Sequence, residues 1–428
     1  MSARAHPSAE WLPAAAVVAS AAYTLWFLLA RGYLPQPFVF DTNDTFMDWF
    51  NTAYWANRPG AYDVWRSIYP PLSFVFLDLT TLPGCYVSGP FHARDCDWLA
   101  KAVIGGAYAL DAALLWIAFS RSDPRTALPR TLAFALGLPM LFTLERGNLI
   151  LVGFAAFVIA YGPITRSLAW RSVASAVTIN FKPYLILPAL AGAVRREWRP
   201  LELAGIATVA LYLLTLAWVG AGSPGEVVSN MANWVQFLTG QVWNEVNYST
   251  SYAPLLQMRG AGLPLLEFLP SRTVEGIEAV LPMVIRSTQL VALAALAAAW
   301  LQPRALPHAR IAAILLGAYL VTQSPGGYTQ AFLLFLVLLE PAKGGAAVAI
   351  GCAYLLCLVG DWPLATILNL ELKSWLTDRP VTPQFGLTVG HFARPGLIVA
   401  IVWALSLDAI VRVAKAHRWY QPVLGFAA

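Results

Sequence analysis

The chain has 428 residues, of which 58% are hydrophobic and only 12% are charged. Soluble domains are usually about 45–50% apolar and about 25% charged, so this composition excludes a soluble enzyme, a nucleic-acid-binding protein and a disordered scaffold. The net charge of +5 comes from Lys and Arg in short loops beside apolar runs, a pattern typical of membrane proteins. With a mean hydropathy of +0.60, the chain is predicted to cross a membrane many times.

Apolar runs long enough to cross a membrane recur along the chain. A membrane-crossing helix needs about 20 mostly apolar residues. The first run, 11–30, lacks a signal-peptide cleavage pattern, so we expect it to be retained as a span. The other runs of this size are 98–119, 172–193, 201–220, 279–301, 344–361 and 394–413.

Two longer apolar stretches, 131–161 and 311–340, are each interrupted near the middle. Non-helical backbone at membrane depth is tolerated only where protein or a water-filled cavity satisfies it, so we expect both breaks to form walls of a site. We predict an all-α, single integral-membrane domain over 1–428, with about 10–12 transmembrane or re-entrant helices. The two interruptions are Glu145-Arg146-Gly147-Asn148 and Gln323-Ser324-Pro325-Gly326-Gly327-Tyr328.

Clusters of basic residues divide the loops between two sides of the membrane. By the positive-inside rule, these clusters are cytoplasmic. This leaves loops 31–97, 221–278 and 362–393 on the extracytoplasmic side, while the number of crossings between 130 and 195 stays open. The clusters are Arg121/Arg125/Arg130, Arg195/Arg196/Arg199, Arg304/His308/Arg310 and Arg412/Lys415/Arg418.

The first extracytoplasmic loop carries two carboxylates, Asp44 and Asp48, four residues apart. Residues at this spacing share one face of a helix, and partial desolvation at a membrane surface would raise the pKa of a carboxylate toward that of a useful general base. The alternative is a solvated acidic loop. The outside loops also mix aromatic rings with Asp, Asn and Gln, which suits a sugar site, although an interfacial aromatic belt explains many of the Trp residues.

Two basic residues lie inside apolar surroundings. Arg146 lies in the first break, and Lys182 lies within the run 172–193. Ionisable residues inside a span are costly and mark functional sites, so we expect both to pair with an anionic group, most plausibly a lipid-linked phosphate. The alternative for Lys182 is that its side chain reaches to an interface.

The cysteines and histidines predict little chemistry. Cys85 and Cys96 lie in the same outside loop and could form a disulfide in an oxidising compartment. The five histidines show no metal-ligand spacing, and the sequence contains no nucleotide-binding or hydrolase motif. We therefore predict no metal and no cofactor.

Four stretches, in this order, resemble the multi-spanning GT-C glycosyltransferases, specifically glycosyltransferase family 87. That family includes mannosyltransferases that use polyprenyl-phosphate-mannose as donor. The resemblance covers most of 41–340, and the segment SPGGYTQAFLL looks like a late family stretch. The four stretches are DTFMDWFN with the following SIYPPL, ERGNLILV, INFKPYLILPAL and VNYSTSYAPLLQ.

The resemblance implies a GT-C-like fold and an inverting transfer of a monosaccharide (mannose or another hexose or pentose) from a polyprenyl-phosphate donor to a lipid or glycan acceptor. Asp48 best matches the family's aspartate base, with Asp44 as competitor. Arg146 and Lys182 match the basic positions that would bind the donor phosphate. The implied location is a bacterial inner membrane with the site facing the periplasm. Candidate sugar or acceptor contacts are Asn51, Tyr69, Asn148, Asn247 and Tyr248.

Three other functions compete with this interpretation. A secondary transporter also uses broken helices, but it should show repeated halves and short loops on both sides. A polysaccharide polymerase or ligase shares the lipid-phosphate substrate but usually depends on arginines and a histidine in large outside loops. A purely structural membrane protein gives no reason for Lys182 in a span.

Overall fold

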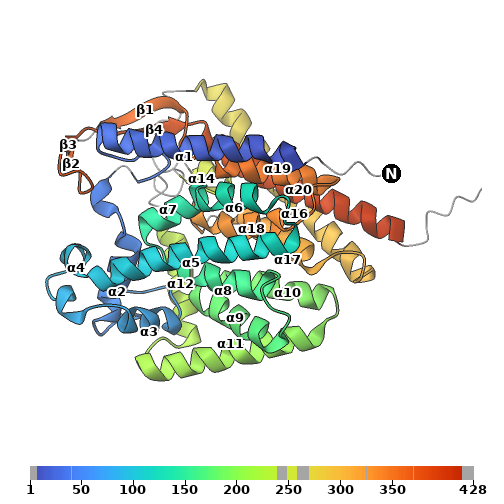
Figure 1. The fold of residues 1–428 in the computed structure, drawn as a ribbon, viewed down its shortest axis with the longest axis horizontal. Coiled ribbons are helices and arrows are strands. Elements are labelled where there is room, and N and C mark those ends of the chain that lie inside the picture. Colours follow the sequence, from blue (N-terminus) through green and yellow to red (C-terminus); the bar gives the residue numbers. More distant parts are fainter. Residues whose placement is uncertain are drawn as a thin grey trace, which may run out of the picture.

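The structure is a computed structural model that describes residues 7–39, 41–238, 248–257, 269–323, 325–369 and 371–416. Most of the described chain is helical, and several of the longer helices run roughly parallel to one another (Figure 1). Among the described residues, the helical segments long and apolar enough to cross a membrane number six: Trp11–Arg31 (α1), Trp98–Ser122 (α5), Ala127–Arg146 (α6 and α7), Trp198–Val219 (α11), Ser271–Leu301 (α16) and Gly390–Ala416 (α20).

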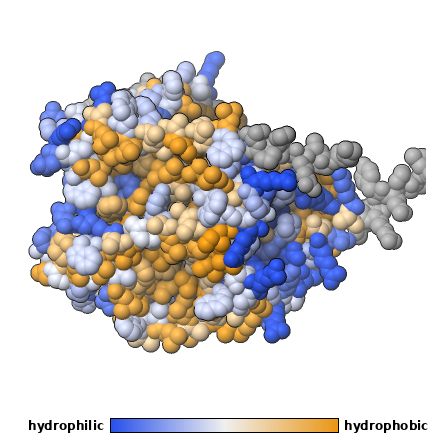
Figure 2. Space-filling view, viewed as in Figure 1, coloured by the Kyte–Doolittle hydropathy of each residue, from blue (hydrophilic) through white to orange (hydrophobic). Residues whose placement is uncertain are grey.

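Shorter apolar helices fill the centre of the bundle. They include Ile150–Tyr161 (α8), His308–Thr322 (α17), Gln330–Leu338 (α18) and Gly345–Cys357 (α19). Rings on α8 and α18 interlock, as in the Phe157–Phe332 pair, whose centroids are 4.9 Å apart, and both side chains are fully buried. The prediction of a mostly helical, multi-pass membrane protein is confirmed. Figure 2 shows apolar residues over the middle of one face and hydrophilic residues gathered toward its two ends.

The first predicted break separates two helices. Leu138–Arg146 (α7) ends at Gly147, which adopts the left-handed conformation with φ of 58° that glycine tolerates best. The side-chain oxygen of Asn148 then accepts a hydrogen bond of 3.0 Å from the N–H of Ile150, the first residue of α8.

The apolar run 172–193 is not one span, which corrects the sequence prediction. Leu168–Phe181 (α9) ends at Lys182, and the chain returns through Pro183–Leu185 (η4) and Ile186–Val194 (α10). A residue before proline is forced out of the helical region, and Lys182 has φ of −143° and ψ of 103°.

Both ends of this segment lie at the same end of the bundle. Arg171 donates to the carbonyl of Ala160, Arg195 donates to the carbonyl of Leu306, and the Tyr161 and His308 rings stack nearby. Helices α9 and α10 therefore form a helical hairpin with Lys182 at its apex.

Helices α17 and α18 form a second hairpin of the same kind. Arg310 at the start of α17 donates to Glu340, just after α18, at 2.8 Å, so both ends again lie at one end of the bundle. The apex contains Gly327–Thr329 (η5) and lies at the second predicted break. The two apices touch, because the Tyr184 and Thr329 hydroxyls are 3.1 Å apart.

Loop 31–97 folds over the other end of the bundle. Cys85 and Cys96 of this loop form a disulfide, as the sequence suggested. Its elements are Thr42–Asp44 (η2), Met47–Ala56 (α2), Pro71–Leu79 (α3), Pro83–Tyr86 (η3) and Pro90–Cys96 (α4).

Short strands, which the all-α prediction missed, lie beside this loop (Figure 1). Pro363–Asn369 (β1) pairs antiparallel with Gln384–Thr388 (β4), and Leu372–Lys373 (β2) pairs with Pro380–Val381 (β3). Two further helices, Pro224–Leu238 (α12) and Ala253–Gln257 (α14), belong to the predicted loop 221–278.

Candidate active site

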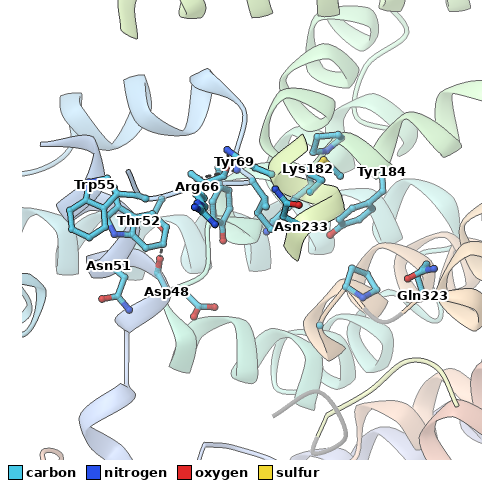
Figure 3. Close-up of a pocket in the computed structure, with 18 of the residues that line it drawn as sticks. Asp48, Asn51, Thr52, Trp55, Arg66, Tyr69, Lys182, Tyr184, Asn233 and Gln323 are labelled. Carbon is cyan, nitrogen blue, oxygen red and sulfur yellow. Dashed lines mark hydrogen bonds between the residues drawn. The ribbon is translucent and has the colours of Figure 1, made fainter. Parts of the chain in front are cut away.

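A cavity of about 620 Å³ lies between the first loop, α12 and the apices of the two helical hairpins. Asp48, Asn51 and Trp55 line one side from α2, while Lys182, Tyr184 and Gln323 line the opposite side (Figure 3). Arg66 and Tyr69 lie between them in the same view. Further lining residues are Thr52, Trp65, Ser67, Ile68, Pro183, Asn230, Met231, Asn233, Tyr319, Pro325, Gly326 and Tyr328.

Asp44 and Asp48 converge on one guanidinium. Arg146 Nη1 is 2.5 Å from Asp44 Oδ2, and Arg146 Nη2 is 2.6 Å from Asp48 Oδ1. Arg146 Nε also donates to Asp48 Oδ1 at 3.2 Å. The predicted shared helix face is wrong, because Asp44 ends η2 and Asp48 lies in α2; Arg146 is what brings the two carboxylates together.

Asp48 is held by both of its oxygens. Its second oxygen, Oδ2, accepts a hydrogen bond of 2.7 Å from Asn148 Nδ2, while Oδ1 faces Arg146. A carboxylate has about four lone-pair sites, so Asp48 keeps acceptor capacity toward the cavity that it lines. Asp48 lies in the first turn of α2, at the end of the helix where the dipole is positive.

Asp44 differs from Asp48 in its surroundings. It does not line the cavity, and 41% of its side chain is exposed. Desolvation of the Asp44 carboxyl raises its pKa above the ordinary value, Arg146 opposes this, and the nearby Asp48 charge raises the pKa further.

Lys182 is a buried cation at the apex of the first hairpin. Only 8% of the residue is exposed, and its Nζ lies 4.2 Å from the centroid of the Tyr69 ring, in a cation–π arrangement. Within the described residues, Lys182 forms no ion pair. A buried ammonium without a carboxylate partner is suited to an anionic ligand.

Arg66 is a second cation at the cavity, and the sequence analysis missed it. It lies on an exposed turn, has a left-handed backbone with φ of 50° and forms no ion pair in the described part of the chain. Asn230 holds this turn by donating to the carbonyls of Tyr62 at 2.9 Å and Ser67 at 3.1 Å. The position of Arg66 between Tyr62 and Tyr69, in a loop rich in aromatic residues, was the sequence signal that could have identified it.

Aromatic and amide groups complete the wall around Asp48. The rings of Trp55 and Trp65 stack with centroids 6.1 Å apart, and both line the cavity. Asn51 and Tyr69, both predicted as sugar contacts, line it too. Such a mixture of flat rings and amide groups suits the C–H faces and hydroxyls of a sugar.

Other predicted residues lie elsewhere. Tyr248 is buried away from the cavity lining, where its hydroxyl accepts from Gln330 Nε2 at 2.5 Å and its ring packs on Phe142. Asn247 lies outside the described residues. Arg146 does not line the cavity, because its guanidinium faces the two aspartates.

The described residues contain no group of three or more His, Cys, Asp or Glu side chains arranged to hold a metal ion. Comparison with models of protein families, with curated proteins and with solved structures gives no match.

Proposed function

We propose that this cavity is the active site of an inverting glycosyltransferase that moves a monosaccharide from a polyprenyl-phosphate donor to a hydroxyl of a lipid or glycan acceptor. The observation that carries the proposal is the presence on the walls of one cavity of an oriented carboxylate, Asp48, and of two cations, Lys182 and Arg66, that form no ion pair among the described residues. A single-displacement transfer needs a base on one side of the sugar and cations at the leaving phosphate.

Asp48 is the proposed general base. The acceptor hydroxyl gives its proton to Asp48 as its oxygen bonds to the anomeric carbon. The bond from that carbon to the phosphate oxygen breaks, and its electron pair stays on the departing polyprenyl phosphate. Attack from the face opposite the leaving group inverts the anomeric configuration.

Lys182 and Arg66 are the proposed contacts of the leaving phosphate. Phosphate oxygens accept charge-assisted hydrogen bonds from ammonium and guanidinium groups, which stabilise the charge that develops as the bond breaks. Arg146, which already contacts Asp44 and Asp48, is proposed to orient these carboxylates and not to bind phosphate.

A lipid-linked donor suits the position of the cavity. Its walls include the apices of two helical hairpins in a multi-pass membrane protein, so a polyprenyl chain beside the bundle would carry its phosphate close to Lys182. We propose a bacterial inner membrane with the cavity facing the periplasm, and a GT-C-like enzyme resembling glycosyltransferase family 87.

Transfer by the purified protein in proteoliposomes tests the proposal, with polyprenyl-phosphate donors of several sugars. We expect Asp48→Asn to lower the rate by about 10²–10⁴-fold, because a positioned base contributes this much. Asp44→Asn should have a smaller effect because Asp44 does not line the cavity. Asp78→Asn, on an exposed residue of α3, is the matched control and should keep full activity.

Two results would contradict the proposal. Wild-type turnover in both Asp48→Asn and Asp44→Asn would show that the general base does not lie in this loop. Counterflow of a free solute without any glycosidic product would support a transporter, whose sites also lie at broken helices.

A further inference from the structure

Phe46, between Asp44 and Asp48, has an uncommon backbone conformation. Its φ of 65° and ψ of 5° lie in the left-handed region, which bulky residues rarely adopt. The conformation turns the chain from η2 into α2. As a result, Asp44 at the end of η2 and Asp48 in the first turn of α2 both reach Arg146.

Two neighbours, at the end of α7 and just after it, contact the Phe46 backbone. The Phe46 N–H donates to the carbonyl of Glu145 at 2.8 Å. Gly147 lies so close that an added Cβ would be 3.2 Å from Phe46 Cα. These contacts hold the backbone of Phe46 but leave its ring free to pack elsewhere.

Trp375, from the segment between β2 and β3, packs against that ring. The two ring centroids are 6.0 Å apart with an interplanar angle of 82°, an edge-to-face arrangement. The backbone N–H of Trp375 donates to Thr42 Oγ1 at 2.9 Å, so the same residue also contacts the chain just before Asp44.

Trp375 is itself fixed by α4. Its Nε1 donates to Asp95 Oδ1 at 2.8 Å, and the Arg94 guanidinium lies 4.2 Å from the centroid of its ring. Arg94 also donates to the carbonyl of Asn43. Trp375 thus lies between α4 and the chain 42–46, with contacts to both.

We propose that Trp375 is a positioning residue: by packing on Phe46 it holds the left-handed turn that aligns Asp44 and Asp48 on Arg146. The kinetic consequence rests on the proposed transferase function, but the effect on the turn is measurable without any activity. A merely structural Trp375 would affect the yield of folded protein and leave the turn and the rate per folded molecule unchanged.

A buried thiol reports on the turn directly. Thr45 is 3% exposed, so Thr45→Cys in a background with Cys352→Ala and Cys357→Ala should react slowly with a membrane-impermeant maleimide. We expect Trp375→Ala to accelerate labelling about tenfold, because local opening exposes the thiol. Trp375→Phe, which keeps a ring, should change it much less, and Trp362→Ala, on a tryptophan that is 76% exposed, should not change it.

A double-mutant cycle identifies the partner of Trp375. Glycine adopts left-handed angles without strain, so Phe46→Gly removes both the ring and the need to hold it. In that background, Trp375→Ala should add little to the labelling rate. If the fold-increases in labelling rate caused by Phe46→Gly and by Trp375→Ala multiply in full in the double variant, Trp375 acts through another contact and the proposal is wrong.

Kinetics with the native Thr45 complete the test. Trp375→Ala should lower kcat about 10–100-fold, because small misplacements of reacting groups cost this much. The KM for the donor should be unchanged, because Lys182 and Arg66 lie on other segments. If Trp375→Ala does not fold, Asp95→Ala, which removes the acceptor of Trp375 Nε1, should still accelerate labelling to a smaller degree.

The two proposals fail separately. Equal thiol protection in wild-type and Trp375→Ala or Asp95→Ala backgrounds would overturn the positioning role whatever the activity. A wild-type protein without transferase activity but with accelerated labelling in Trp375→Ala would overturn only the proposed function.

Discussion

Lys182 is held in a position that favours ligand binding over stability. Burial of an ammonium without an ion pair costs free energy, and the contact with the Tyr69 ring offsets only part of this cost. A residue with only a structural role would be better replaced by an apolar side chain. Replacing Lys182 by an apolar residue should therefore raise the stability of the fold and lower ligand binding.

We expect Lys182→Met to raise the free energy of unfolding by about 1–2 kcal/mol, because it removes the buried charge. The same variant should lower sugar transfer about 100-fold, because one phosphate contact is lost. Thermal unfolding in detergent and a transfer assay measure the two effects. Lys343→Met, at an exposed lysine, is the control; a Lys182→Met protein that is both less stable and fully active would contradict the phosphate role.

The raised pKa of Asp44 predicts a pH dependence. A raised pKa means that Asp44 is protonated at a higher pH than an ordinary aspartate, so its ion pair with Arg146 weakens first as the pH falls. We expect kcat/KM to fall on acidification while the pH is still above about 3.9, the ordinary pKa of aspartate. Asp44→Asn removes this titrating group, so the fall in kcat/KM should begin at a lower pH. An unchanged pH dependence would exclude Asp44 as its cause.

At the scale of elements, helix breaks create the cavity. Glycine and charged residues inside an apolar stretch were a clear signal, and the predicted breaks at 145–148 and 323–328 are confirmed. The third break, at Lys182, was not predicted, because one lysine and one proline leave the run 172–193 almost fully apolar. Only the packing of α9 and α10 against neighbours shows that the chain turns back.

The Gly147 break has a strict steric requirement. A Cβ at this position would lie 3.2 Å from Phe46 Cα and 3.3 Å from Phe46 O, on a backbone with positive φ. We expect Gly147→Ala to lower the free energy of unfolding by about 1–2 kcal/mol and to reduce transfer. Gly105→Ala, in the interior of α5 where an added Cβ meets nothing within 4 Å, should be neutral or stabilising; equal effects of both would contradict the requirement.

At the scale of the whole molecule, the charges divide between two ends. Arg130, Arg195, Arg310 and Arg412, all from predicted cytoplasmic clusters, lie at the end of the bundle opposite the cavity. There Arg310 pairs with Glu340 at 2.8 Å and with Asp408 at 2.6 Å, and its side chain is fully buried. These ion pairs join α17, α18 and α20 where the hairpin ends meet.

Removing one partner of this buried network leaves an uncompensated charge. Arg310→Leu should therefore lower the free energy of unfolding by about 3–5 kcal/mol. Arg412→Leu, at a side chain that is 36% exposed and pairs with Asp408 within one helix turn, should cost less than about 1 kcal/mol. Thermal unfolding measures the stability of both variants. Similar losses of stability in Arg310→Leu and Arg412→Leu would show that burial does not determine the cost of removing the charge. The donor KM should not change, since both arginines lie far from the cavity.

The sequence by itself determined the membrane class and the two interrupted stretches, and it named Asp44 and Asp48 as site candidates and Cys85 and Cys96 as disulfide candidates. Those features depend on composition, on short spacing or on cysteine content. The tertiary structure decided which groups meet: that Arg146 contacts both aspartates, that Lys182 lies against the Tyr69 ring, that Tyr248 lies away from the cavity, and that Trp375 reaches Phe46. These contacts join segments far apart in the chain, and no local pattern specifies how such segments pack.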